Sequence, residues 1–175
     1  VDKRFIKSLK TFDKKIDKCE ISWITQSTPM GFGHALLSAK KFVGNETFLL
    51  YAGDAFFLKS NFLSDFIDNH QKSKNAICSV LLEHKKYLKG FGIAQVKKKN
   101  NENVIFNIEE KPKKPKSNFA VLPVYIFEPL VFDALKKTIH GYNNELQVTD
   151  AIQTLIGWDK KVISFNYKQK SWFDI

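Results

Sequence analysis

Segments of β-strand character alternate with helical patterns in the first half of the chain, and this alternation is the feature that most constrains the fold. Residues 20–26 (EISWITQ), 47–54 (TFLLYAGD) and 76–84 (AICSVLLEH) are typical of strands, and helical patterns separate them. The second helical pattern, residues 60–74, has apolar side chains at helical spacing. Such alternation predicts an α/β fold, with a mostly parallel sheet and helices on both faces.

The second half of the chain begins with strands and ends with helices. Residues 90–96, 103–112 and 120–127 are predicted strands, and the KKKNNEN turn joins the first two. We interpret residues 91–127 as a small β-layer inserted against the sheet, within a single domain that covers residues 1–175.

Further helices are predicted at residues 4–12, 128–139 and 145–158, and a further strand at 161–167. The helix that opens at Pro129 is expected to stop at Gly141. Thr149 or Asp150 is expected to cap the last helix near its start.

Composition limits the class of protein. With 175 residues, 43% of them hydrophobic, the chain can bury the core of one domain. The formal net charge of +10 would suit a polyanion, but Arg4 is the only arginine among 28 basic residues. Because arginine reads base edges and clamps phosphates, we expect solvated lysines and no nucleic-acid binding.

Membrane spans and disulfides are not expected. No apolar run approaches the roughly 18–20 residues that a membrane span needs. Cys19 and Cys78 are isolated and lack the spacing of zinc ligands. We therefore expect a cytoplasmic protein with reduced cysteines and no membrane partner.

An acidic residue follows the apolar run at residues 48–51. Ala52 and Gly53 come next, and Asp54 then lies where the strand would end. Such sheets bind ligands at the carboxyl ends of their strands, and Gly53 would let another group approach the backbone. A carboxylate there suits Mg²⁺, which binds one or two carboxylates together with substrate phosphates. A turn or a helix N-cap is the alternative.

Charged residues end two further predicted strands. Glu109, Glu110 and Lys111 precede Pro112; a glutamate can bind two sugar hydroxyls, and a lysine can neutralise a phosphate. Asp174 follows two aromatic residues and would supply a second Mg²⁺ ligand. An ordinary charged strand end is the alternative for Glu109, Glu110 and Lys111.

Residues 26–42 (QSTPMGFGHALLSAKKF) contain two glycines just before a helical pattern. Gln26 offers the donor and the acceptor that a base edge requires, and Gly31 and Gly33 permit a tight backbone. A phosphate-binding loop of the P-loop kind carries a lysine, whereas the first lysine here is Lys40, inside the helix. We interpret the loop as facing a base or a sugar, with a plain helix start as the alternative.

Seven segments of the chain occur in the order in which similar segments occur in the sugar-phosphate nucleotidyltransferase family. They are QSTPMGFGHAL, FLLYAGD, GFGIAQV, IEEKP, SNFAVLPVYIF, NNELQVTDAI and WFDI. The chain resembles this family from Gln26 to its last residue, and it is most similar to the UTP–glucose-1-phosphate uridylyltransferase and glucose-1-phosphate thymidylyltransferase branch. The resemblance implies a Rossmann-like nucleotidyltransferase sheet that is incomplete at both ends.

The resemblance also implies roles for individual residues, which join those expected from the strand ends. Nucleotide binding is assigned to Gln26, Gly31 and Gly53, and Mg²⁺ binding to Asp54 and Asp174. Sugar binding is assigned to Gly92, Glu110 and the backbone of Val121. Lys111 is assigned the contact with the sugar phosphate. Of these, Asp54, Lys111 and Asp174 would be the catalytic residues.

The family reaction joins an oxygen of a sugar 1-phosphate to the α-phosphorus of a nucleoside triphosphate and releases pyrophosphate. The attacking oxygen is already anionic, so Mg²⁺ and cationic side chains need only position the groups and stabilise charge. The implied partners are UTP or dTTP, a sugar 1-phosphate and UDP-glucose. UTP is favoured, because no arginine lies near Asn143 and Asn144, where some thymidylyltransferases have one. Glucose 1-phosphate is the favoured sugar phosphate.

The chain departs from the family at both ends. It has no glycine-rich loop similar to GxGTRxxPxTxxxPK, which binds the triphosphate in the family, and it stops at Ile175, before an expected Gly-Thr. We therefore expect an internal piece of an enzyme with an open sheet edge and little or no activity alone. A missing N-terminal segment, a second polypeptide or assembly into a homo-oligomer would complete it. A non-catalytic relative that binds nucleotide sugars or regulates a partner is the alternative.

Overall fold

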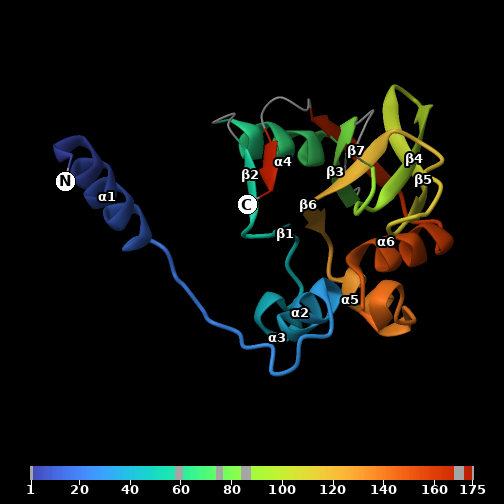
Figure 1. Cartoon of the computed structure of the whole chain (residues 1–175), viewed down its shortest axis with the longest axis horizontal. Helices are drawn as coiled ribbons and strands as arrows, with labels where there is room; N and C mark the ends of the chain where they lie inside the picture. The colour runs from blue at the N-terminus through green and yellow to red at the C-terminus, as the bar shows by residue number, and fades with distance from the viewer. Residues whose placement is uncertain (1, 58–60, 74–76, 84–87, 168–171, 175) are drawn as a thin grey trace.

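A six-stranded sheet has helices on both of its sides (Figure 1). The structure is a computed structural model that describes residues 2–57, 61–73, 77–83, 88–167 and 172–174. The sheet has the order β1-β6-β3-β7-β5-β4, and β2 pairs with β8 in a second, two-stranded sheet. The strands are β1 (Phe48–Tyr51), β2 (Ala55–Phe57), β3 (Ile77–Glu83), β4 (Ile93–Lys99), β5 (Glu102–Glu109), β6 (Phe119–Phe127), β7 (Val162–Tyr167) and β8 (Trp172–Asp174).

The sheet is mixed rather than mostly parallel. β3 and β7 pair in parallel, whereas the other described pairings are antiparallel. β6 lies between β1 and β3 and runs against both, so these two strands share a direction without being neighbours. β6 follows the β4–β5 hairpin with no helical crossover, which a parallel connection would need. The predicted α/β sheet is confirmed, and its predicted mostly parallel pairing is wrong.

The strands between residues 91 and 127 belong to this sheet. β6 lies in its interior, and the β4–β5 hairpin extends it through contacts with β6 and β7. Asn100 and Asn101 connect the hairpin with φ angles of 48° and 62°, as a two-residue turn of type I′ requires. The predicted hairpin is confirmed, but the prediction of a separate layer packed against the sheet is wrong.

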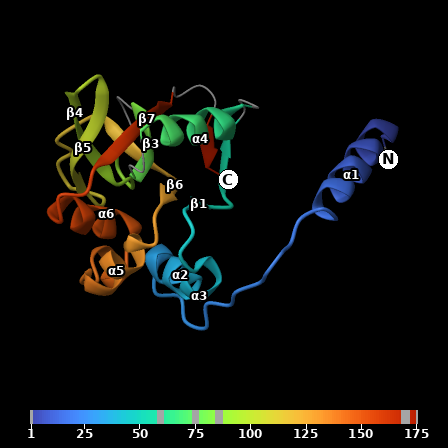
Figure 2. The ribbon, with the colours of Figure 1, turned by 180° about the vertical axis from the view of Figure 1, so that it is seen from behind.

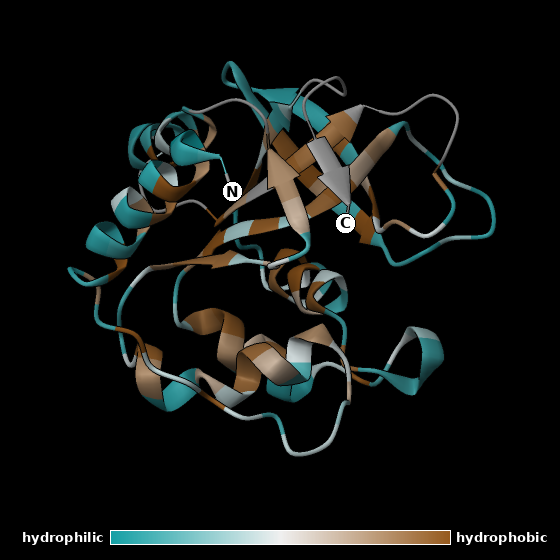
Figure 3. Cartoon of the chain, turned by 60° about the vertical axis from the view of Figure 1, so that its left-hand side comes forward, coloured by the Kyte–Doolittle hydropathy of each residue, from teal (hydrophilic) through white to brown (hydrophobic). Residues whose placement is uncertain are grey.

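Apolar clusters cover both faces of the sheet. On one face, Phe62 and Phe66 of α4 (Phe62–Lys72) pack on β3, β6 and β7. On the other face lie α2 (Phe32–Ser38), α5 (Leu130–Lys137) and α6 (Val148–Gly157). Because both faces are buried there, the inner strands β3 and β6 are almost continuously apolar, and Figure 3 shows brown along their part of the sheet. The prediction of helices on both faces is confirmed.

The N-terminal helix α1 (Lys3–Ile16) lies apart from the sheet in both views (Figures 1 and 2). Asp2 caps it by accepting a hydrogen bond from the backbone N–H of Arg4. No residue of α1 is buried, and its apolar side chains follow helical spacing on an exposed face. The helix predicted at residues 4–12 is confirmed.

The predicted strand at residues 20–26 is wrong, because this segment has no regular secondary structure. Trp23 is 92% exposed. None of the described strands pairs with the segment. β1 lies at the edge of the sheet, and β6 is its one described partner. The outer side of β1 is therefore the predicted open edge.

Two other predicted helices occur where expected but differ at their ends. α5 ends at Lys137 rather than near Gly141, because Thr138 has extended backbone. α6 begins at Val148 with Gln147 as its N-cap residue, so neither Thr149 nor Asp150 caps it. Within the described ranges, every helix is too short or too polar to span a bilayer.

Candidate active site

A pocket of about 390 Å³ lies where the ends of β1 and β5 meet β6 and the start of α6. Five of the predicted site residues line it: Asp54, Gly92, Glu110, Lys111 and Val121. These residues are distant in sequence, and the order of the strands in the sheet brings them together. The pocket is therefore the candidate active site.

Backbone hydrogen bonds hold the wall formed by Gly92. The N–H of Val121 donates to the carbonyl of Gly92 (2.8 Å), and the N–H of Lys111 donates to the carbonyl of Phe91 (3.1 Å). A Cβ atom on Gly92 would lie 2.7 Å from Cγ2 of Thr149. Glycine is required here because α6 approaches the backbone closely. The N–H of Val121 is already bonded within the protein.

Glu110 is held at both of its carboxylate oxygens. Oγ1 of Thr149 donates to Oε2 (2.6 Å), and Nζ of Lys111 lies 3.6 Å from Oε1. The side chain of Glu110 is 11% exposed, so its rotamer is restricted. Carboxylate oxygens accept several hydrogen bonds each, and the fixed geometry suits recognition of neighbouring hydroxyl groups.

Burial and the charge of Glu110 affect two acidic groups nearby. Burial is the larger cause that raises the pKa of Asp150, and the charge of Glu110 is the second. The same two causes, in the same order, raise the pKa of the buried Tyr125 hydroxyl. The negative charge of Glu110 therefore acts on both groups, after the larger effect of burial.

Lys111 brings a positive charge to the pocket. Its backbone has φ 42°, in the left-handed region that residues other than glycine adopt infrequently. This conformation turns the chain at the end of β5. Among the described lining residues, Lys111 is the one cation, and its side chain is 33% exposed. A lysine there can act as a point charge for a phosphate.

Asp54 lies on the turn between β1 and β2, at the exposed rim of the pocket. The antiparallel pairing of β2 with β8 places Ala55 opposite Asp174, so the two predicted Mg²⁺ ligands occupy nearby backbone positions. The side chain of Asp174 lies outside what the structure describes. This register fits an ion that takes two carboxylates and completes its shell with substrate phosphates. Among the described side chains, no three of His, Cys, Asp or Glu gather to hold a metal ion alone.

The predicted base loop packs on the segment before α6. The N–H of Gly33 donates to the carbonyl of Leu146 (2.8 Å), and the N–H of Leu146 donates to the carbonyl of Met30 (2.9 Å). Cβ atoms on Gly31 and Gly33 would lie 2.8 and 2.7 Å from the Leu146 oxygen, and Gly31 also has φ 97°. Both glycines are required by this contact.

Gln26 belongs to the same loop and lies outside the described pocket wall. Its Nε2 lies 2.8 Å from Nδ1 of His34 and donates to the carbonyl of Gly31 (3.3 Å). The loop reaches the pocket through Phe32. Gly53 is exposed and a Cβ atom there would meet no described atom within 4 Å, so its role in nucleotide binding stays a prediction.

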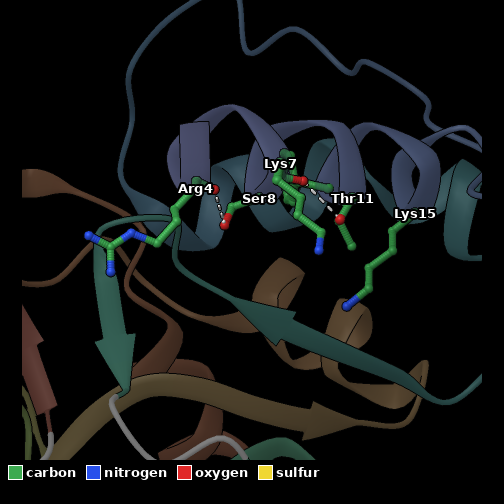
Figure 4. A pocket seen from close by; sticks show the side chains of 6 residues that line it. Arg4, Lys7, Ser8, Thr11 and Lys15 are labelled. Carbon is green, nitrogen blue, oxygen red and sulfur yellow. Dashed lines mark hydrogen bonds between the residues drawn. The ribbon is translucent and has the colours of Figure 1, made fainter. Parts of the chain in front are cut away.

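A second hollow, of about 470 Å³, lies along α1 and is lined by side chains of that helix alone (Figure 4). The hydroxyls of Ser8 and Thr11 donate to the carbonyls of Arg4 and Lys7 (3.1 and 2.9 Å). These bonds are internal to the helix, and no described residue of the sheet contributes to the hollow. We assign no chemistry to it.

Comparison with known proteins identifies the family of the chain. The family model described as nucleotidyl transferase matches residues 2–175. The chain belongs to the nucleotidyl transferase family. The predicted family is thereby confirmed, and the α/β sheet described above is a nucleotidyltransferase sheet.

Two family members illustrate the range of the similarity. A glucose-1-phosphate thymidylyltransferase of Streptomyces antibioticus is 33% identical over 137 residues, which are 78% of this chain and 37% of that protein. A UTP–glucose-1-phosphate uridylyltransferase of Bacillus subtilis (strain 168) is 30% identical over 166 residues, which are 93% of this chain and 56% of that protein. The chain thus spans between about a third and somewhat over half of the length of these relatives.

A solved nucleotidyltransferase structure has the same fold. UDP-glucose pyrophosphorylase in complex with UDP-glucose superposes with a TM-score of 0.88 at 28% identity. The superposition covers 98% of this chain and 67% of that one. The relatives act on sugar 1-phosphates, as their names state, and this chain shares their family and their fold.

Proposed function

We propose that the chain is part of an enzyme that transfers a uridylyl group from UTP to glucose 1-phosphate. In this reaction an oxygen of the sugar phosphate bonds to the α-phosphorus, the bond from that phosphorus to the β-phosphate oxygen breaks, and pyrophosphate leaves. One observation carries the proposal: Asp54, Gly92, Glu110 and Lys111 surround a single pocket in a chain of this family.

The sugar would bind at the wall formed by Gly92, Glu110 and Val121. The carboxylate of Glu110 is fixed by Thr149 and would accept hydrogen bonds from two hydroxyl groups of the sugar. Gly92 would contact the sugar ring through its backbone. Because these groups orient the sugar, they would place its phosphate beside Lys111.

The phosphates would bind between Lys111 and the turn that holds Asp54. Lys111 would neutralise the sugar phosphate as a point charge. A Mg²⁺ ion held by Asp54 and Asp174 would supply charge neutralisation on the triphosphate when bound. Gln26 and Gly31 would contribute to nucleotide binding through the loop that packs on Leu146, and Gly53 through the turn between β1 and β2.

Uracil is the proposed base and glucose the proposed sugar. The uridylyltransferase relative and the structure solved with UDP-glucose support this choice, as does the absence of arginine at residues 142–145. The thymidylyltransferase relative makes dTTP the competitor to test. A cytoplasmic location and assembly into a homo-oligomer are further parts of the proposal.

We also propose that the 175 residues alone have little or no transferase activity. The described pocket wall has one cation, Lys111, whereas stabilising a triphosphate in the transition state takes several positive groups. This observation also favours the second candidate, a protein that binds nucleotide sugars without catalysis.

Calorimetric titration of the chain with UDP-glucose and Mg²⁺ tests the proposal. We expect saturable binding that Glu110→Gln weakens at least about tenfold, the usual effect of losing a charged hydrogen-bond partner. Glu109→Gln is the matched control, because Glu109 is the exposed neighbour on the same strand. No binding by the folded chain, or equal losses in the two variants, would contradict the proposed site. Release of pyrophosphate from UTP by the chain alone would contradict its proposed inactivity.

A further inference from the structure

The ammonium of Lys111 lies over the ring of Tyr142, with Nζ 5.0 Å from the ring centroid. This distance is within the range of a cation–π interaction. Tyr142 is 47% exposed and lies outside the described lining of the pocket, whereas Lys111 lines it. The aromatic ring therefore contacts the lysine from outside the pocket.

The turn that holds Tyr142 is well defined by hydrogen bonds. Tyr142 begins a short 3-10 helix, η1 (Tyr142–Asn144), in which Asn143 and Asn144 have φ angles of 56° and 58°. The amide of Gln147 donates to the carbonyl of Tyr142 (3.3 Å) and to the carboxylate of Glu145 (3.1 Å). These bonds fix the backbone from which the ring projects.

The same turn is tied to the predicted base loop. The N–H of Gly141 donates to the carbonyl of Glu145 (2.9 Å). Leu146, which follows Glu145, donates to the carbonyl of Met30 and accepts from the N–H of Gly33. The position of the Tyr142 ring is thus set by the segment on which the base loop packs.

Two neighbours compete for the ammonium of Lys111. Oε1 of Glu110 lies 3.6 Å from Nζ, and a carboxylate both attracts the ammonium and cancels its charge. The ring attracts the same ammonium but carries no net charge. A lysine held partly by a ring keeps more of its positive charge available to a phosphate.

We propose that Tyr142 is a positioning residue that holds the ammonium of Lys111 in place for the phosphate of the sugar. The inference rests on the proposed function, because it concerns how Lys111 meets a sugar phosphate. Tyr142 touches neither the sugar nor the nucleotide in this proposal, and it acts through Lys111.

The contact itself can be tested without any ligand. Lysines of the chain are dimethylated with ¹³C-formaldehyde, and the signal of Lys111 is identified by its loss in Lys111→Arg. We expect an upfield ring-current shift of this signal in the wild type and in Tyr142→Phe, and its loss in Tyr142→Leu. An unshifted Lys111 signal in the wild type would overturn the inference.

Ligand titrations test the consequence. We expect Tyr142→Leu to weaken the binding of UDP-glucose about two- to fivefold, the effect of one exposed cation–π contact. The affinity of Tyr142→Phe for UDP-glucose should equal that of the wild type. UMP, which lacks the sugar phosphate, should bind the wild type, Tyr142→Leu and Tyr142→Phe with equal affinity. In a Lys111→Met background, Tyr142→Leu should have no further effect.

The outcomes separate this inference from the proposed function. Equal weakening of UMP and UDP-glucose in Tyr142→Leu would mean a structural role for the turn and overturn the inference alone. Unchanged UDP-glucose affinity in Tyr142→Leu would also overturn it while the proposed function stands. Failure of the folded wild type to bind UDP-glucose would overturn both, and the ring-current shift would then still report whether the contact exists.

Discussion

Thr149 Oγ1 donates a hydrogen bond of 2.6 Å to Oε2 of Glu110, although the two residues are 39 positions apart. Thr149 lies in the first turn of α6, and Glu110 follows the last residue of β5. The bond therefore joins a helix to the end of a strand at the wall of the pocket. Thr149 is not the cap of α6, because it is the second residue inside the helix.

Removal of this hydroxyl should destabilise the protein. Thr149→Val leaves a nearly buried carboxylate oxygen without its donor, so we expect the free energy of unfolding to fall by about 1–3 kcal/mol. Thr149→Ser keeps the hydroxyl and should lose less. Urea unfolding followed by circular dichroism measures both variants. If Thr149→Ser and Thr149→Val lower the free energy of unfolding equally, the loss comes from packing, and the hydrogen bond does not stabilise the fold.

A side chain at Gly33 should disrupt the attachment of the base loop. A Cβ atom there would lie 2.7 Å from the carbonyl oxygen of Leu146 and 2.9 Å from Cδ2 of Leu135. We expect Gly33→Ala to lower the free energy of unfolding by about 1–3 kcal/mol, as overpacking usually does. Gly157→Ala, at the end of α6, meets no described atom within 4 Å and should be neutral or stabilising. Equal thermal unfolding midpoints of the two variants would show that the loop can move aside.

The metal assignment predicts that Asp54 is needed for binding of a divalent ion. Mn²⁺ can replace Mg²⁺ as a paramagnetic probe, and the relaxation of water protons reports its binding. In the presence of UDP-glucose, we expect Asp54→Asn to weaken Mn²⁺ binding at least about tenfold, because one of two carboxylates is lost. Asp13→Asn, on the exposed helix α1, is the control. Equal Mn²⁺ affinity in wild type and Asp54→Asn would exclude Asp54 as a ligand.

Asp150 should make stability depend on pH. Burial, and then the charge of Glu110, raise its pKa in the folded protein above the ordinary value of 3.8. Asp150 therefore loses its proton at lower pH in the unfolded chain than in the folded protein. As a result, the free energy of unfolding falls as the pH rises from about 3.8 through the folded pKa. Asp150→Asn should be more stable than the wild type at pH 7, with the difference vanishing toward pH 3. A difference that stays constant over this range, or that also occurs with Asp68→Asn, would exclude titration of Asp150 as the cause.

The exposed face of α1 should promote association. Phe5 and Phe12 are both 58% exposed and lie two helical turns apart, with Leu9 between them. We expect self-association that grows with protein concentration in light scattering and decreases in the double variant Phe5→Ser, Phe12→Ser. Lys3→Ser with Lys10→Ser has the same spacing on a polar part of the helix and should change little. A monomer at all concentrations would contradict this prediction.

Local patterns located most of the helices and strands correctly. α4 follows from the helical spacing of its apolar residues, β3 from its apolar run, and the β4–β5 hairpin from the KKKNNEN turn between two predicted strands. The prediction of a strand at residues 20–26 was wrong for a physical reason. A strand needs a neighbouring strand for its backbone hydrogen bonds, and none of the described strands pairs with this segment. Strand propensity alone cannot supply that neighbour.

The sequence by itself determined the family and five residues of the pocket wall. Asp54, Glu110 and Lys111 each lie at the end of a predicted strand, and the order of the motifs along the chain links them. Only the tertiary structure decided that β6 runs between β1 and β3, that Thr149 bonds Glu110, and that Tyr142 meets Lys111. These contacts join distant segments, so they depend on how strands and helices pack against one another, and the periodicity of one segment contains no information about its neighbour.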